Sequence, residues 1–189
     1  MTAVALRVED LPHYTYDDYV QWEGRWELIQ GIPYAMVPAP VINHQRVIRD
    51  IERQLGDLLD NCSRCEILRT VDWPITEDTV VQPDLLVVCG NQDEIGVTKL
   101  EITPVIVFEV LSPSTSKKDR TIKYRLYEEA GVKYYCIVDI DTKSAAIFSL
   151  QDQPAKYREE NEFKDEKILF DLGPCRIAFD FGKIFSQYY

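Results

Sequence analysis

Apolar residues recur along this chain at two spacings, which predict where its helices and strands lie. Between residues 43 and 60 the apolar positions are three and four residues apart, the period of an amphipathic helix. Asn43 is a good N-terminal cap, so we predict that the helix begins there, and His44 falls on its apolar stripe. A second long helix is predicted over about 118–130, where Ile122, Leu126 and Ala130 share one side and Gly131 is a natural stop.

Continuous apolar runs predict strands over 66–75, 80–89, 105–111, 134–140 and 144–150. Residues 25–29 and 32–37 flank a Gln-Gly pair and predict a hairpin, preceded by a short helix over about 15–22. The run LLVV after Asp84 is typical of a strand covered on both faces. This order predicts an α/β or α+β fold in which a mixed central sheet is flanked by helices, with 1–189 as a single domain.

The charge balance limits the partners that the chain can bind. Its formal net charge is −11, which counts against a large nucleic-acid footprint, because phosphate backbones are bound mostly by Lys and Arg. A nuclease with this charge must depend on a local basic patch, on metal ions or on a partner subunit. One dense basic cluster is present over 117–125, although such a cluster is equally typical of a solvated helix start.

Sequence features also bear on location and on the five cysteines. We expect a cytoplasmic protein with no membrane span, because the chain has no apolar run of eighteen residues and no signal-peptide pattern at residues 1–18. The odd cysteine count does not resemble a secreted disulfide framework, and Cys89 and Cys136 are predicted to pack as small hydrophobes. Cys62 and Cys65 form a CxxC, but no second CxxC or HxxxH completes a zinc site, and this CxxC follows a helix instead of opening one.

The chemistry points to three positions on or beside the buried-looking strands. Asp84 follows Pro83 in an apolar stretch, Glu109 lies inside another apolar run, and Lys123 follows on the second long helix. If the two strands are adjacent, two bare carboxylates repel and one pKa rises. A bound Mg²⁺ or Mn²⁺ would relieve this repulsion and activate a water for phosphodiester hydrolysis, with Lys123 stabilising charge on the phosphate. The alternative is that Asp84 caps a turn and Glu109 pairs with a basic residue.

Several motifs together resemble the Uma-two family of restriction-endonuclease-like proteins, a branch of the PD-(D/E)XK nuclease superfamily. The matching segments cover most of residues 14–140 in the family's order: YDDY at 16–19, ELIQG at 27–31, His44 with its helix, QPDLLVV at 82–88, FEVLSPST at 108–115, DRTIK at 119–123, Tyr127, and GVKYYCIVD at 131–139. The resemblance implies a restriction-endonuclease-like core in which Asp84 and Glu109 hold the metal. It also implies a homodimer, since members of the superfamily often work as dimers.

Two positions depart from that pattern, and three further residues are candidates for supporting roles. The superfamily usually has lysine two residues after the second acid, where this chain has Leu111, so Lys123 would be a migrated replacement; Cys136 stands where the family favours Trp. Glu27 is interpreted as a further metal ligand or an orienting acid, or else as a surface strand residue. His44 supports the ligands, contacts a phosphate or is a satisfied core residue, and Tyr127 restrains Lys123 or simply packs.

The sequence therefore predicts a metal-dependent DNA endonuclease with catalytic residues Asp84, Glu109, Lys123, Glu27, His44 and Tyr127, of which Asp84 and Glu109 bind Mg²⁺ or Mn²⁺. Two other functions stay open. One is a binding or regulatory protein that keeps the nuclease fold without catalysis, which the acidic charge favours. The other is a small-molecule or RNA hydrolase that uses the same metal site.

Overall fold

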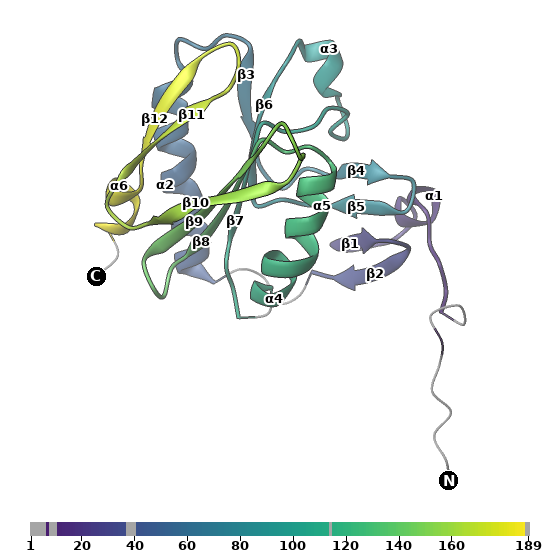
Figure 1. The fold of residues 1–189 in the computed structure, drawn as a ribbon. Coiled ribbons are helices and arrows are strands. Elements are labelled where there is room, and N and C mark those ends of the chain that lie inside the picture. Colours follow the sequence, from purple (N-terminus) through teal and green to yellow (C-terminus); the bar gives the residue numbers. More distant parts are fainter. Residues whose placement is uncertain (1–6, 8–10, 37–40, 114, 188–189) are drawn as a thin grey trace.

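The chain folds into three β-sheets with helices packed against them (Figure 1). The computed structural model describes residue 7 and residues 11–36, 41–113 and 115–187. The elements in chain order are α1 (Tyr16–Tyr19), β1 (Trp26–Ile29), β2 (Ile32–Ala35), α2 (Ile42–Leu59), β3 (Cys65–Leu68), β4 (Trp73–Thr76), β5 (Thr79–Val81), β6 (Leu85–Cys89), α3 (Gln92–Ile95), β7 (Ile106–Val110), α4 (Ser116–Lys118), the π-helical turn η2 (Asp119–Lys123), α5 (Tyr124–Glu129), β8 (Tyr134–Asp139), β9 (Ser144–Leu150), β10 (Tyr157–Phe163), β11 (Lys167–Asp171), β12 (Arg176–Asp180) and α6 (Phe181–Phe185).

The central sheet is mixed, as the sequence predicts. Its six strands run in the order β10-β9-β8-β7-β6-β3, with β7 and β8 parallel and the other neighbours antiparallel. A four-stranded sheet, in the order β2-β1-β5-β4, contains the predicted hairpin β1–β2, whose turn places Gln30 and Gly31 at positive φ. Residue 37 of the predicted hairpin lies outside the described residues. The small sheet β11–β12 completes the set.

Two of the predicted strands are in fact pairs of strands in different sheets. The run 66–75 divides into β3 and β4, and the run 80–89 divides into β5 and β6. Thr70, at a φ of 52°, breaks the first run, and Gln82 to Asp84 break the second, where Pro83 cannot donate to a strand ladder. Asp84 therefore lies at the junction between the two sheets, immediately before β6.

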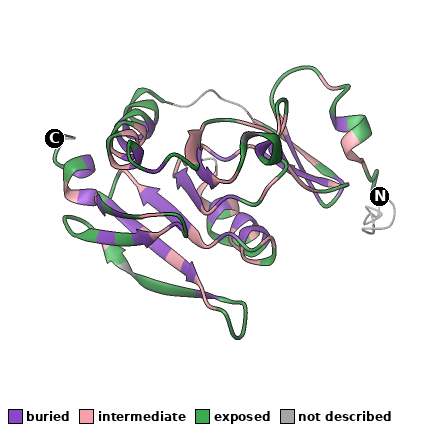
Figure 2. Ribbon diagram, turned by 90° about the horizontal axis from the view of Figure 1, so that it is seen from above, coloured by how far each residue is buried: buried purple, intermediate pink, exposed green. Residues whose placement is uncertain are grey.

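The strand β6 is covered on both faces, as its LLVV run predicts. Leu85 and Val87 belong to the apolar core that includes α2 and the β11–β12 hairpin, whereas Leu86 and Val88 belong to the core on the side of α5. Figure 1 shows α2 and α5 on opposite sides of the central sheet, with the four-stranded sheet beside α5. In Figure 2 the buried residues concentrate in the central strands, while hairpin tips and outer helix faces are exposed.

The two long helices are present, each with one difference from its prediction. Helix α2 begins at Ile42 with Val41 as its N-cap, and Asn43 lies in the first turn, where its side chain accepts a hydrogen bond from Arg46. The second helical stretch is not uniform, because the π-helical turn η2 separates α4 from α5. Gly131, at a φ of 82°, ends it as expected.

The cysteines differ most from their predicted roles. Cys136 is free and buried, as predicted, but Cys89 forms a disulfide with Cys65, its direct partner across β3 and β6. A second disulfide joins Cys62 to Cys175. The expectation for Cys89 is wrong because strand pairing, which spacing in the sequence does not reveal, places a second cysteine opposite it.

Within the part of the chain that the structure describes, no helix is long and apolar enough to cross a membrane. The signal-peptide expectation concerns residues 1–18, of which 1–6 and 8–10 lie outside the described residues.

We predict that Leu55→Ala lowers the free energy of unfolding by about 2–5 kcal/mol, because Leu55 is fully buried in the core between α2 and the central sheet. The neighbouring change Gly56→Ala is the matched control. A Cβ at Gly56 meets nothing within 4 Å, and alanine favours a helix interior by up to about 1 kcal/mol. Urea denaturation of both variants checks this, and equal effects would contradict the assignment of Leu55 to the core.

Candidate active site

A pocket of about 670 Å³ opens where the two larger sheets meet. Its walls come from β2, the N-terminal turn of α2, the start of β6, the end of β7, and the α4–η2 segment. The polar residues that line it include Arg25, His44, Asp84, Glu109, Ser112, Thr115, Lys117, Lys118, Asp119, Thr121 and Lys123. Asp84, Glu109, Lys123 and His44, predicted from distant parts of the sequence, therefore share one cavity.

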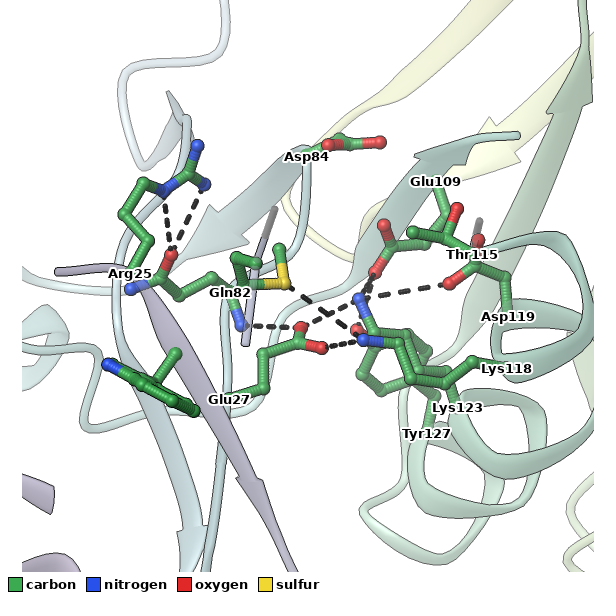
Figure 3. A network of polar contacts seen from close by, with 12 residues as sticks. Arg25, Glu27, Gln82, Asp84, Glu109, Thr115, Lys118, Asp119, Lys123 and Tyr127 are labelled. Atoms are coloured by element: carbon green, nitrogen blue, oxygen red, sulfur yellow. Dashed lines mark hydrogen bonds and ion pairs between the residues drawn. The ribbon is translucent and has the colours of Figure 1, made fainter. Parts of the chain in front are cut away.

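Lys123 is the centre of the charged network (Figure 3). Its Nζ lies 2.8 Å from Glu109 Oε1, 2.8 Å from Glu27 Oε1 and 3.9 Å from Asp119 Oδ1. Only 2% of Lys123 is exposed. Burial alone would lower the pKa of this ammonium, but Glu109, Glu27 and Asp119 together raise the pKa well above its usual value. Lys123 is therefore charged at neutral pH.

Glu27 is completely buried, so its interpretation as a surface strand residue is wrong. Hairpin strand β1 carries its carboxylate to Lys123 and Lys118, and the backbone N–H of Gln82 donates to Glu27 Oε1 at 3.1 Å. Burial raises the pKa of Glu27, but the two lysines outweigh burial and lower the pKa overall. Glu27 is thus an ionised carboxylate that holds both lysines in place.

Glu109 on β7 is buried and accepts two hydrogen bonds on the same oxygen. Lys123 Nζ and the Tyr127 hydroxyl both donate to Glu109 Oε1 at 2.8 Å. Lys123 and Tyr127 lie four residues apart on one side of the helix, as predicted, and the Tyr127 ring also stacks on Trp73. Tyr127 therefore both packs and positions Glu109. Burial raises the pKa of Glu109 to about 8, with Lys123 opposing the shift and Asp84 and Asp119 adding to it.

Asp84 and His44 form the opposite wall of the pocket. Asp84 Oδ2 accepts from the backbone N–H of Val110 at 2.9 Å, which ties it to β7 one residue after Glu109. His44 Nε2 lies 3.1 Å from Asp84 Oδ2 and 2.8 Å from the Val110 carbonyl oxygen. Burial lowers the pKa of His44, but Asp84 and the Val110 carbonyl raise it overall. His44 therefore supports Asp84, although its buried Nδ1 has no hydrogen-bond partner among the described residues.

Two residues of the site, Asp119 and Lys118, were not singled out from the sequence as site residues. Asp119 is 1% exposed, burial raises its pKa, and its Oδ1 has no hydrogen-bond partner among the described residues. The Tyr135 hydroxyl donates to the Asp119 carbonyl at 3.0 Å. The D-x-x-x-K spacing could have identified Asp119, because residues four apart in a helix are neighbours. No local pattern predicts that Lys118 meets Glu27, since the two are 91 residues apart.

The predicted basic cluster is divided between the interior and the surface. Lys118 and Lys123 face the buried acids, and Arg120 lies 3.4 Å from Asp139 Oδ2. Lys117 and Arg125 remain exposed, and Lys117 lines the pocket. The cluster therefore serves mainly to balance the site's own carboxylates instead of forming a broad phosphate-binding surface.

The donor set fits a divalent cation with oxygen ligands. Three carboxylates (Asp84, Glu109 and Asp119) line the pocket, and a fourth, Glu27, pairs with Lys118 and Lys123. Burial raises the pKa of Glu109, with the neighbouring acids adding to the shift, and Asp119 Oδ1 has no hydrogen-bond partner among the described residues. Within the described residues, these carboxylates do not form a group of three whose ligand atoms lie within 4.8 Å of one another. Such a site suits Mg²⁺, which binds through one or two carboxylates and keeps several waters.

We predict that Lys123→Met lowers the free energy of unfolding by about 3–5 kcal/mol near neutral pH, because it leaves buried carboxylates without their cation. Lys117→Met removes an exposed lysine six residues earlier and is expected to change stability by no more than about 0.5 kcal/mol. Urea denaturation of the two variants measures the difference, and a Lys123→Met protein as stable as Lys117→Met would show that the network contributes little.

Comparisons with known proteins show the fold and the family of the chain. A crystal structure described as "a putative nuclease belonging to DUF820", from Anabaena variabilis, superposes with a TM-score of 0.73, covering 93% of this chain and 99% of that one at 14% identity. The chain thus has the α+β, restriction-endonuclease-like fold of that structure. The uncharacterized protein slr1290 of Synechocystis is 33% identical over 123 residues, which span 61% of this chain and 63% of that protein.

A family model connects the fold to a named group of proteins. The model Uma2, described as "Putative restriction endonuclease", matches residues 16–174, a segment that contains every residue of the pocket network. The resemblance found in the sequence motifs is confirmed, and the chain belongs to the Uma2 family.

Proposed function

We propose that this chain is a metal-dependent endonuclease that hydrolyses DNA phosphodiester bonds. The observation that carries the proposal is that Asp84, Glu109 and Lys123, which come from distant parts of the sequence, line one open pocket, with Lys123 paired to Glu109. The family and the fold of this chain support a nuclease at the coarser level. Asp84 and Glu109 would hold Mg²⁺ or Mn²⁺, which would lower the pKa of a bound water and stabilise charge on the phosphate.

The residues around these two acids would prepare them for that role. Tyr127 and Lys123 fix Glu109 through its Oε1, and His44 and the Val110 amide fix Asp84. Glu27 restrains Lys123 so that its ammonium lies at the pocket wall, where it can stabilise charge that develops on a phosphate oxygen. Water attacks phosphorus and the 3′ oxygen leaves with a proton. A homodimer would place two such pockets on a duplex, and sedimentation of the chain tests that part of the proposal.

A protein that keeps the fold without catalysis is the second candidate. Two observations favour it: the net charge of −11, and the position of Lys123, whose ammonium is already bound by Glu27 and Glu109. Calorimetry with Mn²⁺ separates the two functions, because the non-catalytic protein needs no cation in the pocket. A hydrolase of RNA or small molecules would share the metal site and is distinguished by a panel of substrates.

We predict that the wild-type chain nicks supercoiled plasmid with Mg²⁺ or Mn²⁺, and that Asp84→Asn and Glu109→Gln each lower the rate by about a hundredfold or more. Metal ions contribute several kcal/mol to such transition states, and each 1.36 kcal/mol is tenfold in rate. Asp57→Asn, an exposed position on α2, is the matched control and should keep wild-type activity. Equal cleavage by Glu109→Gln and wild type would refute the proposed site.

We also predict that Mn²⁺ affinity rises with pH and levels off above about pH 8. Because burial raises the pKa of Glu109 to about 8, a proton competes with the cation below that pH. If Glu109 alone titrates, the dissociation constant falls by nearly tenfold per pH unit between about pH 6 and pH 7.5. Calorimetry across this range measures the slope. The Glu109→Gln variant should bind more weakly and lose the slope, whereas a wild-type affinity that is independent of pH would contradict the assignment.

A further inference from the structure

Four of the five cysteines meet at one corner of the molecule, away from the pocket. Cys62 follows helix α2, Cys65 opens β3, Cys89 ends β6, and Cys175 lies in the turn between β11 and β12. The segment that contains Cys62 and Cys65, the end of β6 at Cys89 and the turn at Cys175 are separated from one another in the sequence by at least 24 residues. The sulfurs therefore gather because the fold brings together a helix end, two strand ends and a hairpin turn.

Backbone hydrogen bonds determine where each cysteine lies. The Cys65 N–H donates to the Cys62 carbonyl at 3.0 Å, which closes a tight CxxC turn. The Gly90 N–H donates to the Arg64 carbonyl at 2.8 Å and joins the end of β6 to that turn. In the hairpin, the Leu172 N–H donates to the Cys175 carbonyl at 2.9 Å. The first two contacts hold Cys62, Cys65 and the end of β6 together without the sulfurs, and all four cysteines belong to or pack against the same apolar core, which also includes the β11–β12 hairpin.

Three of the four sulfur atoms are close enough to share a single ion, and the fourth, Cys89 Sγ, is bonded to one of them, Cys65 Sγ. They are paired as Cys62–Cys175 and Cys65–Cys89, and Cys62 Sγ lies 3.4 Å from Cys65 Sγ in the other pair. The sulfurs of Cys62, Cys65 and Cys175 all lie within 4.8 Å of one another. Four thiolates at about 2.3 Å from Zn²⁺ in a tetrahedron are about 3.8 Å apart, which is close to the 3.4 Å between the sulfurs of Cys62 and Cys65.

We propose that this corner, with its cysteines reduced, binds one Zn²⁺ through the thiolates of Cys62, Cys65, Cys89 and Cys175. Two equivalents of a dithiol reductant convert the two disulfides to four thiols and are themselves oxidised to two disulfides. Binding of Zn²⁺ then forms four Zn–S bonds and releases four protons. A closed site with four sulfur ligands has the composition of a structural zinc site, with a CxxC turn supplying two of the ligands.

The surroundings suit the charge of such a site. Four thiolates and one Zn²⁺ carry a net charge of −2. Arg64 and Arg176 are sequence neighbours of Cys65 and Cys175, although Glu66 also adjoins Cys65 and Arg176 Nε lies 3.3 Å from Asp171 Oδ2. Cys62 is 5% exposed, while the other three are partly buried, so the ion would be shielded from water yet reachable from the surface. Thiolate ligands select Zn²⁺ over the Mg²⁺ or Mn²⁺ proposed for the pocket, which prefer oxygen.

The cysteine corner and the pocket lie at opposite ends of one strand. Asp84 immediately precedes β6 and Cys89 ends it, so at about 3.4 Å per residue the two are roughly 17 Å apart. In Figure 1 the corner lies near the labelled end of β3 and the β11–β12 turn, whereas α4, at the pocket, lies at the other end of the sheet. The zinc would fasten the C-terminal hairpin to α2 and the sheet and would take no part in hydrolysis.

The test is a metal titration of the reduced, metal-free chain with Co²⁺ and then Zn²⁺. Wild type and the control Cys136→Ala are expected to bind one ion per chain, with the strong visible and sulfur-to-cobalt charge-transfer bands of a tetrahedral thiolate site. Cys89→Ala and Cys175→Ala should lose this stoichiometric binding. The oxidised wild-type chain should bind no ion at this site until reductant is added. Co²⁺ in the carboxylate pocket would give only weak bands, so the spectrum distinguishes the two sites.

Two results would overturn the proposal. One is a reduced wild-type chain that is folded by circular dichroism but shows no sulfur-to-cobalt band and takes up no Zn²⁺. The other is an unchanged cobalt spectrum in Cys89→Ala or Cys175→Ala. If a variant fails to fold, the intensity of the wild-type cobalt bands still reports the number of sulfur ligands. Because no step measures DNA cleavage, loss of the proposed nuclease activity would not affect the outcome.

Discussion

The buried ammonium of Lys123 is the interaction on which the rest of the site depends. It joins Glu27 from the four-stranded sheet to Glu109 from the central sheet, and its own helix turn supplies Asp119. An unpaired charge at any of these positions would be costly in a low-dielectric interior. The cation between these carboxylates therefore stabilises the packing of the two sheets and the helix, so one interaction both stabilises the junction and shapes the pocket.

Burial of its acids gives the pocket its chemical character. Burial raises the pKa of both Glu109 and Asp119, with Lys123 opposing the shift and neighbouring carboxylates adding to it. The π-helical turn contributes to this arrangement, because it carries both Asp119 and Lys123 into the interior while Arg120 and Thr121 remain exposed. Such turns often occur at functional sites.

Strand β6 connects the two parts of the molecule that carry chemistry. The strand begins beside the carboxylate pocket and ends at Cys89 in the cysteine corner. The residues between are buried on both faces of the sheet. A fully buried strand is rigid, because close-packed side chains on both sides restrict its movement. Asp84, at the start of β6, is therefore attached to a rigid strand. The disulfides that link α2, β3 and the C-terminal hairpin near the other end of β6 add to this rigidity.

Much of the fold could be predicted from the sequence, but the places where elements change sheet could not. The hairpin, helix α2 and strands β7, β8 and β9 follow local hydrophobic periodicity, which reports how each segment meets a core. The runs 66–75 and 80–89 look like single strands because both halves are apolar, and only sheet pairing shows that each divides. The π-helical turn was missed for a similar reason, since the spacing of Ile122, Leu126 and Ala130 fits a regular helix.

The sequence by itself determined the α+β class, the family, and the candidacy of Asp84, Glu109 and Lys123, because these rest on motifs and periodicity that are local in the chain. Only the tertiary structure decided that Glu27 is buried against Lys118 and Lys123, that Asp119 joins them, and that Cys62, Cys65, Cys89 and Cys175 meet. Those contacts join residues up to 113 positions apart, and their energies arise from burial and pairing that exist only once the elements have packed.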